Sequence, residues 1–157
     1  MRQISKRTQY GLRALYSLAK DYGRGPTLIT RLAREEAIPK KFLEQILLTL
    51  KEAGFVSSKK GKGGGYVLAQ SPDQITLGAV IRHMEGPIAP LPCASDMRFR
   101  KCDECVDVET CGTRIVMREV RDAMVAILDK TTLAMVARKV EDAEQRKRAA
   151  SALTYQI

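Results

Sequence analysis

The chain has 157 residues, of which 45% are hydrophobic and 29% charged. This length and composition fit one small domain with an appended helical segment. No apolar run approaches the ~18 residues of a membrane-spanning helix, and the N-terminal stretch lacks the apolar core of a signal peptide. We therefore expect a cytoplasmic protein with no membrane partner.

The net charge of +9 lies in the first half of the chain. Residues 1–72 contain 14 Lys and Arg against 5 Asp and Glu, whereas residues 73–157 contain 13 of each. A basic half beside a neutral half indicates a polyanionic partner such as nucleic acid. A surface tuned only for solubility is the alternative.

Two helices are predicted before Pro39. Ser5 can cap a helix that extends to about Tyr22, after which glycine and proline end it. Residues 27–37 predict a second, short helix with Ile29, Leu32 and Ala33 inward.

A third helix is predicted from Lys40 to Ala53, with Pro39 suited to its first turn. Its expected buried positions are Phe42, Leu43, Ile46, Leu47 and Leu50. Two helices joined by a short turn match a helix-turn-helix, whose second helix enters the major groove. The candidate DNA contacts are Lys40, Lys41, Glu44 and Gln45. An ordinary pair of packed helices is the alternative.

A β-hairpin is predicted directly after this helix. Residues 55–60 and 66–68 have strand character, and the glycines of residues 61–65 tolerate positive φ. A hairpin after a recognition helix is a wing. Lys59, Lys60 and Lys62 lie at its tip, where they could enter a minor groove or bind phosphates. A mobile hairpin without function is the alternative.

The next predicted helix extends from Leu77 to about Met84, with Thr76 as its cap. It contains the only histidine of the chain, His83, which we expect to be structural. A proline-rich linker follows.

All four cysteines lie within 19 residues, at Cys93, Cys102, Cys105 and Cys111. In a reducing compartment, clustered thiols are more often metal ligands than disulfides. Thiolates bind both zinc and iron–sulfur clusters, so the spacing predicts a metal without choosing between the two.

Two long helices are predicted after the cysteines. Thr113 can cap the first, Arg114 to Leu128, and the second extends from Leu133 to about Ala149 after a turn at residues 129–132. The apolar stripe of the first contains Val116, Val120, Met124 (or Ala123) and Ile127. We favour packing on a second copy over folding back on the same chain, since two winged-helix units would then read a palindromic operator. The polar residues from position 144 onward are expected to fray.

The predicted fold is mostly α with a small β-hairpin, a winged helix-turn-helix plus a long dimerisation helix. Its parts are a DNA-binding domain (residues 1–86), a cysteine loop (residues 87–112), dimerisation helices (residues 113–150) and a tail (residues 151–157).

Several short motifs resemble the Rrf-two (Rrf2) family of bacterial transcription regulators. These motifs are YGLRAL at 10–15, FLEQ at 42–45, GFVSS at 54–58, GGGY at 63–66, ITLG at 75–78, EGP at 85–87 and TTL at 131–133. The resemblance covers about residues 1–137. It implies a homodimeric winged-helix regulator, not an enzyme, whose binding to double-stranded DNA is set by an iron–sulfur cluster sensing redox, nitric oxide or iron–sulfur status.

In that family, three cysteines ligate the cluster, and they match Cys93, Cys105 and Cys111. The resemblance also assigns the recognition contacts to the third helix and a wing cation to Lys60. The family's usual fourth ligands are absent, because Arg114 and Gln9 occupy their positions. We hypothesise that Cys102 completes an all-cysteine site for a [2Fe–2S] or [4Fe–4S] cluster.

Two other classes stay open. One is a zinc-stapled or cluster-free winged-helix repressor. The other, less favoured, is an electron-transfer iron–sulfur protein, since a basic wing has no role in that chemistry. The single histidine and the lack of a catalytic constellation argue against an enzyme.

Overall fold

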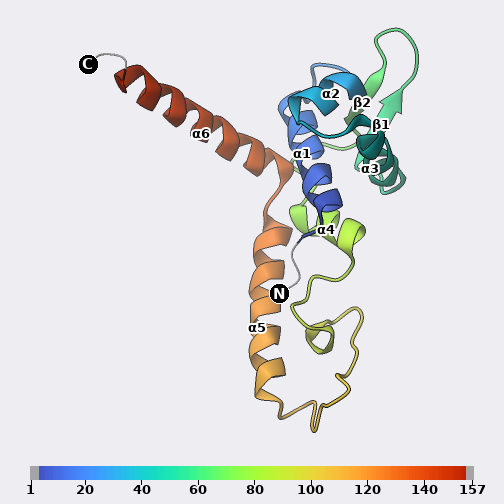
Figure 1. Ribbon diagram of the computed structural model, residues 1–157, viewed down its shortest axis with the longest axis vertical. Helices are drawn as coiled ribbons and strands as arrows, with labels where there is room; N and C mark the ends of the chain where they lie inside the picture. Colours follow the sequence, from blue (N-terminus) through green and yellow to red (C-terminus); the bar gives the residue numbers. More distant parts are fainter. Residues whose placement is uncertain (1–3, 155–157) are drawn as a thin grey trace.

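The computed structural model describes residues 4–154, which form six α-helices and one antiparallel hairpin (Figure 1). The elements are α1 (Lys6–Lys20), α2 (Ile29–Glu35), α3 (Lys40–Glu52), β1 (Val56–Lys59), β2 (Gly65–Leu68), α4 (Leu77–Glu85), the 3-10 turn η1 (Pro92–Ala94), α5 (Gly112–Lys130) and α6 (Leu133–Thr154). Helices α1–α4 and the hairpin form a head, from which α5 extends as a stalk and α6 projects away. None of these helices is long and apolar enough to cross a membrane. The predicted mostly α, winged-helix architecture is confirmed.

The core of the head consists of aliphatic side chains from all four of its helices. Leu15 of α1, Leu32 of α2, Leu47 of α3 and Val80 of α4 are fully buried. The prediction that Phe42 is buried is wrong, because its side chain is 41% exposed. Phe42 lies in the first turn of α3, at the rim of the core, and meets the ring of Tyr10 edge-on with centroids 5.8 Å apart.

The wing is joined to the chain before α2. In the hairpin, Val56 pairs with Leu68 and Lys59 with Gly65. Thr27, which the sequence placed in a helix, instead forms a β-bridge with Tyr66 through two backbone hydrogen bonds of 2.9 Å. A Cβ at Gly65 would collide with the Thr27 carbonyl, and φ there is +150°. Only glycine fits this position, which fixes the base of the wing against the head.

The C-terminal helices are longer than predicted. Helix α5 begins at Gly112 with Cys111 as N-cap, so the predicted cap at Thr113 is wrong. The Cys111 carbonyl accepts a hydrogen bond from Ile115 N at 3.0 Å. The first turn of α5 therefore begins two residues before the predicted start. The predicted turn at 129–132 shrinks to two residues, and α6 continues to Thr154. Of the predicted tail at residues 151–157, residues 151–154 belong to α6, and residues 155–157 lie outside the described part of the chain.

The junction between α5 and α6 is fastened to the head. Leu133, the first residue of α6, is fully buried in the head's core. Thr132 forms a β-bridge with Thr76 just before α4. The guanidinium of Arg82 binds the Asp129 carboxylate through two hydrogen bonds of 2.7 and 2.8 Å and holds the pKa of that carboxyl below its usual range. The stalk therefore has a fixed direction relative to the head.

Replacing Leu133 by alanine tests this junction. We expect Leu133→Ala to lower the free energy of unfolding by about 2–5 kcal/mol, because it leaves a cavity in the core. Leu48→Ala on the exposed side of α3 is the matched control and should change stability by less than about 0.5 kcal/mol. Chemical denaturation followed by circular dichroism measures both. Equal effects of the two substitutions would contradict the anchoring role.

Candidate DNA-binding surface and cysteine loop

The predicted recognition residues share one face of α3. Lys40, Lys41, Glu44 and Gln45 are all exposed, whereas the buried residues of α3 are Leu43, Ile46, Leu47 and Leu50. Neither Lys40 nor Lys41 forms an ion pair with any described residue. The amide, carboxylate and ammonium groups needed for base and phosphate contacts therefore point to solvent together.

The wing presents its three predicted lysines beside this helix. Lys59, Lys60 and Lys62 are exposed. Lys51 near the end of α3 donates a 2.7 Å hydrogen bond to Ser58 Oγ in β1. This contact, which sequence reasoning missed, fixes the spacing between the helix and the strand that leads to the wing tip.

The four cysteines come from three short segments and line one cavity. Cys93 lies in η1, Cys102 and Cys105 lie in a turn closed by a 3.2 Å backbone hydrogen bond, and Cys111 caps α5. All four are free thiols that line a cavity of about 510 Å³. The structure thus gathers the predicted metal ligands, including Cys102. His83 instead packs edge-on against Phe55, with ring centroids 6.0 Å apart.

The thiols influence one another electrostatically. Burial raises the pKa of the Cys93 and Cys105 thiols, and the nearby Cys102 thiol raises both further. Lys101 opposes this shift at Cys105. A positive charge near the thiols favours their anionic form, which is the form that ligates metals.

The donor chemistry fits a soft or borderline centre, because all four candidate ligands are sulfur atoms facing one cavity. Their spacing is not that of a closed single-ion site. Among residues 4–154, no group of three or more His, Cys, Asp or Glu side chains is placed to hold a metal ion. Binding a zinc or iron–sulfur centre through Cys93, Cys102, Cys105 and Cys111 would therefore require these thiols to move closer together than they lie here.

Arg114 connects both ends of the cysteine loop to α5. Its Nε donates to the Cys93 carbonyl at 2.9 Å, and its NH1 group donates to the Val108 carbonyl at 3.2 Å. Its guanidinium also lies 5.6 Å from the centre of the Phe99 ring. Arg114, which sequence reasoning treated only as a departure from a ligand position, is therefore a side chain that binds the loop backbone.

Arg121 lies about two turns after Arg114 on α5 and makes a second connection between α5 and the cysteine loop. Its side chain is 6% exposed and donates to the Ala94 carbonyl at 2.7 Å, and it also binds the carboxylates of Asp96 and Asp122. Sequence reasoning missed this residue. The only available signal was an arginine on the side of α5 away from the apolar stripe, which does not distinguish a buried arginine from a solvated one.

A winged helix-turn-helix head on a helical stalk defines a class of DNA-binding transcription regulators. The family model described as "Rrf2: Iron-dependent Transcriptional regulator" matches residues 4–139. The chain therefore belongs to the Rrf2 family of transcriptional regulators, which are not enzymes.

Individual relatives agree with this assignment. The chain is 39% identical over 133 residues to an rrf2-like HTH-type transcriptional regulator of Rhodobacter capsulatus, covering 83% of this chain and 89% of the relative. It is 38% identical to the regulator CymR of Bacillus subtilis over 83% of this chain and 86% of the relative. The solved structure of that CymR, titled the global cysteine regulator, superposes with a TM-score of 0.75, at 37% identity and covering 88% and 98% of the two chains. The structure of T. potens IscR gives a TM-score of 0.71 at 31% identity, covering 90% of each chain.

Substituting Arg121 tests how the loop is held. We expect Arg121→Met to destabilise the protein by about 1–3 kcal/mol, because the buried Ala94 carbonyl loses its donor. The loop should also become easier to cleave in limited proteolysis. Arg118→Met, one turn earlier on the exposed side of α5, is the matched control and should leave both properties unchanged. Protection of the loop equal to wild type in Arg121→Met would contradict this role.

Proposed function

We propose that this chain is a homodimeric regulator that binds a palindromic operator, and that an iron–sulfur cluster held by its four cysteines sets its affinity for that DNA. The observation that carries the proposal is the single cavity lined by all four thiols at the base of α5. Thiolate sulfur is the ligand that iron–sulfur clusters use. When bound, the cluster would supply a centre whose integrity depends on oxygen, nitric oxide or iron supply.

The DNA-binding half of the proposal rests on α3 and the wing. In this proposal Gln45 and Glu44 contact base edges in the major groove, while Lys40 and Lys41 bind bases or phosphates. Lys59, Lys60 and Lys62 contact the backbone or the minor groove beside it. All seven side chains are exposed, and the surrounding half of the chain carries the whole net positive charge.

The proposed dimer forms through the apolar stripe of α5. Val116 is 51% exposed and Ile127 66% exposed, and Val120 and Met124 between them are also exposed. Val116 and Ile127 are therefore largely uncovered by their own chain, whereas Val120 and Met124 are each 37% exposed. A helical row of aliphatic side chains on the stalk is well suited to packing on a second copy.

In this proposal the cysteine loop connects the DNA-binding surface to the dimer contact. Arg114 joins the Cys93 carbonyl to the first turn of α5, and the other end of α5 is fastened to the head through Asp129. We propose that ordering of the loop by the cluster fixes the position of α5 in the dimer and so the distance between the two recognition helices.

A cluster-free regulator whose thiols respond directly to sulfur chemistry is a second candidate. The likeness to a protein titled a global cysteine regulator favours it, as does the S. aureus CymR solved in an oxidized form at 31% identity. A zinc-stapled repressor would use the same thiols without sensing through them.

Purification without oxygen separates these candidates. We expect brown protein with a visible absorption band, containing iron and inorganic sulfide in comparable amounts. Removing the cluster with a chelator should change the affinity for a selected operator by about tenfold or more, the size of a typical coupling free energy. Fluorescence anisotropy on protein with and without cluster measures it. Colourless protein that contains zinc, or no metal, would contradict the proposal that the cysteines hold an iron–sulfur cluster.

Cys102 provides a sharper test of the ligand set. We expect Cys102→Ala to lower cluster yield and alter the absorption spectrum. The control is Glu109→Ala, two residues before Cys111 and outside the lining of both cavities that contain cysteines, which should retain both. An unchanged yield and spectrum in Cys102→Ala would remove this residue from the ligand set and leave the three-cysteine assignment.

The dimer is tested on α5. We expect Val120→Glu combined with Ile127→Glu to weaken self-association by roughly 30-fold or more, because an interface hot spot contributes about 2 kcal/mol or more. Arg118→Glu with Ala126→Glu adds acidic residues to exposed positions of the same helix away from the stripe and is the control. Light scattering after size exclusion gives the mass. A stripe variant that remains fully dimeric would contradict the interface.

A further inference from the structure

The segment between Cys93 and Cys102 contains two arginines that the proposed function does not use. We infer that Arg98 and Arg100 bind backbone phosphates of the DNA duplex, so that the cysteine loop is itself a DNA-contacting element. This inference rests on the proposed DNA binding and extends it to a third contact, beyond α3 and the wing.

The first observation is the charge state of these side chains. Arg98 and Arg100 are exposed, and neither forms an ion pair with any described residue. By contrast, Arg82 and Arg121 bind carboxylates. Asp96, two residues before Arg98, is engaged by Arg121. The carboxylates that share a cavity wall with the arginines are Glu85, with both, and Asp103, with Arg100. Two unpaired guanidinium groups two residues apart suit phosphates, which arginine binds with two parallel N–H donors.

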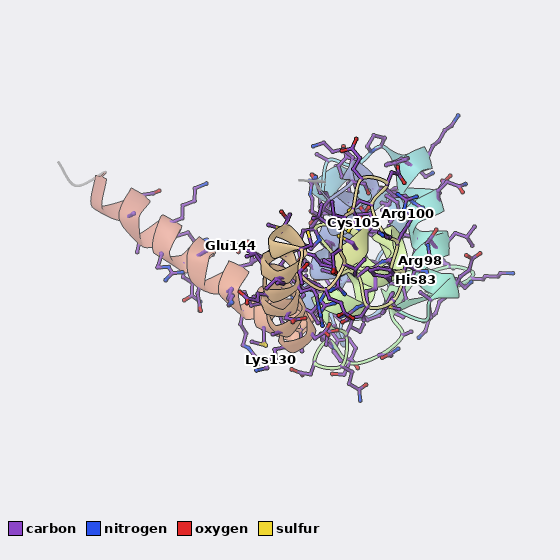
Figure 2. All side chains as sticks on the ribbon, turned by 90° about the horizontal axis from the view of Figure 1, so that it is seen from below. His83, Arg98, Arg100, Cys105, Lys130 and Glu144 are labelled. Atoms are coloured by element: carbon purple, nitrogen blue, oxygen red, sulfur yellow. The ribbon has the colours of Figure 1, made fainter. Side chains whose placement is uncertain are left out.

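The second observation is where they lie. Figure 1 shows the cysteine loop and α3 on the same side of α5, with α6 on the opposite side. Figure 2, a view at right angles, labels Arg98 and Arg100 on that side and Glu144 of α6 on the other. Figure 1 also shows that the loop lies further along the long axis of the molecule than α3. A duplex that extends from the recognition helix along this side of the molecule would pass the arginines.

The third observation is that the segment is fixed in place. Arg98 N donates to Ser95 Oγ at 3.0 Å, and Arg100 N donates to the Pro92 carbonyl at 3.3 Å. Phe99 between them lies beneath the guanidinium of Arg114. A cavity of about 570 Å³ adjoins the segment and has both arginines in its wall. Because the backbone of the segment is already ordered, binding by these arginines costs less loop ordering than binding by cations on a mobile loop.

The same contacts join the two arginines to the thiols. Arg114 contacts Phe99 and the Cys93 carbonyl at once. A change in the loop at Cys93 would therefore move Arg98 and Arg100 directly. The state of the cysteines would reach the DNA through the loop as well as through the spacing of the recognition helices.

The experiment compares Arg98→Ala/Arg100→Ala with wild type in full-length protein. The probe is a duplex selected from a random library with the wild-type protein, and anisotropy gives its Kd at several salt concentrations. Each lost phosphate contact lowers the slope of log K against log salt by about 0.9. We expect the slope to become shallower by about two per chain. The affinity should weaken by the same factor for all operator variants.

Two further variants serve as controls. Arg146→Ala/Arg148→Ala removes the same charge from the distal half of α6 and should leave the slope at the wild-type value. Arg98→Lys/Arg100→Lys keeps the charge and should restore most of the slope. Thermal melting and the mass in solution confirm that each variant is folded and associated as wild type is.

The outcomes separate this inference from the function on which it rests. If wild type binds DNA and the alanine pair has the same slope as the α6 control, the inference is overturned and the proposed function stands. If the alanine pair alone loses the dimer, the arginines dock on a second copy and the inference is also overturned. If the wild-type protein selects no duplex from the library, the proposed DNA-binding function is wrong. The proposed contact through Arg98 and Arg100 is then wrong as well.

Discussion

The structure depends on the joint between the head and the stalk. Leu133 inserts into the core of the head, Thr132 pairs with Thr76, and Asp129 binds Arg82 through two hydrogen bonds. An apolar contact, a backbone bridge and an ion pair thus hold three residues within the five-residue stretch 129–133. Because the joint is rigid, a displacement of α5 must move α3 and the wing with it. A regulator that controls DNA binding from a distant loop needs this property.

At its other end, α5 holds the cysteine loop with two arginines that bind backbone carbonyls. Arg114 binds the Cys93 and Val108 carbonyls, and Arg121 binds the Ala94 carbonyl. Guanidinium groups suit this role, because several fixed donors on one side chain can satisfy loop carbonyls that have no partner within secondary structure. The helix therefore shapes the loop before any centre is bound, and the thiols face a common cavity. In the proposed function, one helix carries both the sensor and the dimer contact.

The basic charge of the first half can act only where its cations are free. Lys40, Lys41 and the wing lysines are unpaired among the described residues, whereas Arg13, Arg24 and Arg31 bind acidic neighbours. Paired arginines contribute little to attracting a polyanion, since their charge is locally neutralised. Sorting the cations by their partners thus removes the paired arginines from the candidates. The α3 and wing lysines, with Arg98 and Arg100 from the half that is neutral overall, are among the cations without an ion pair to any described residue, as Lys6, Arg7 and Arg34 are.

The sequence by itself determined the helices, the wing and the grouping of the thiols. Apolar periodicity located α1, α3 and α4, the glycines located the wing, and the spacing of the cysteines predicted one shared site. These features are local, so short-range pattern suffices. Only the tertiary structure decided that Thr27 joins the wing, that Phe42 stays half exposed, and that Arg114 and Arg121 hold the loop. Each of these depends on a carbonyl, a strand or a core surface contributed by residues distant in sequence, and no local pattern of residue types encodes such a partner.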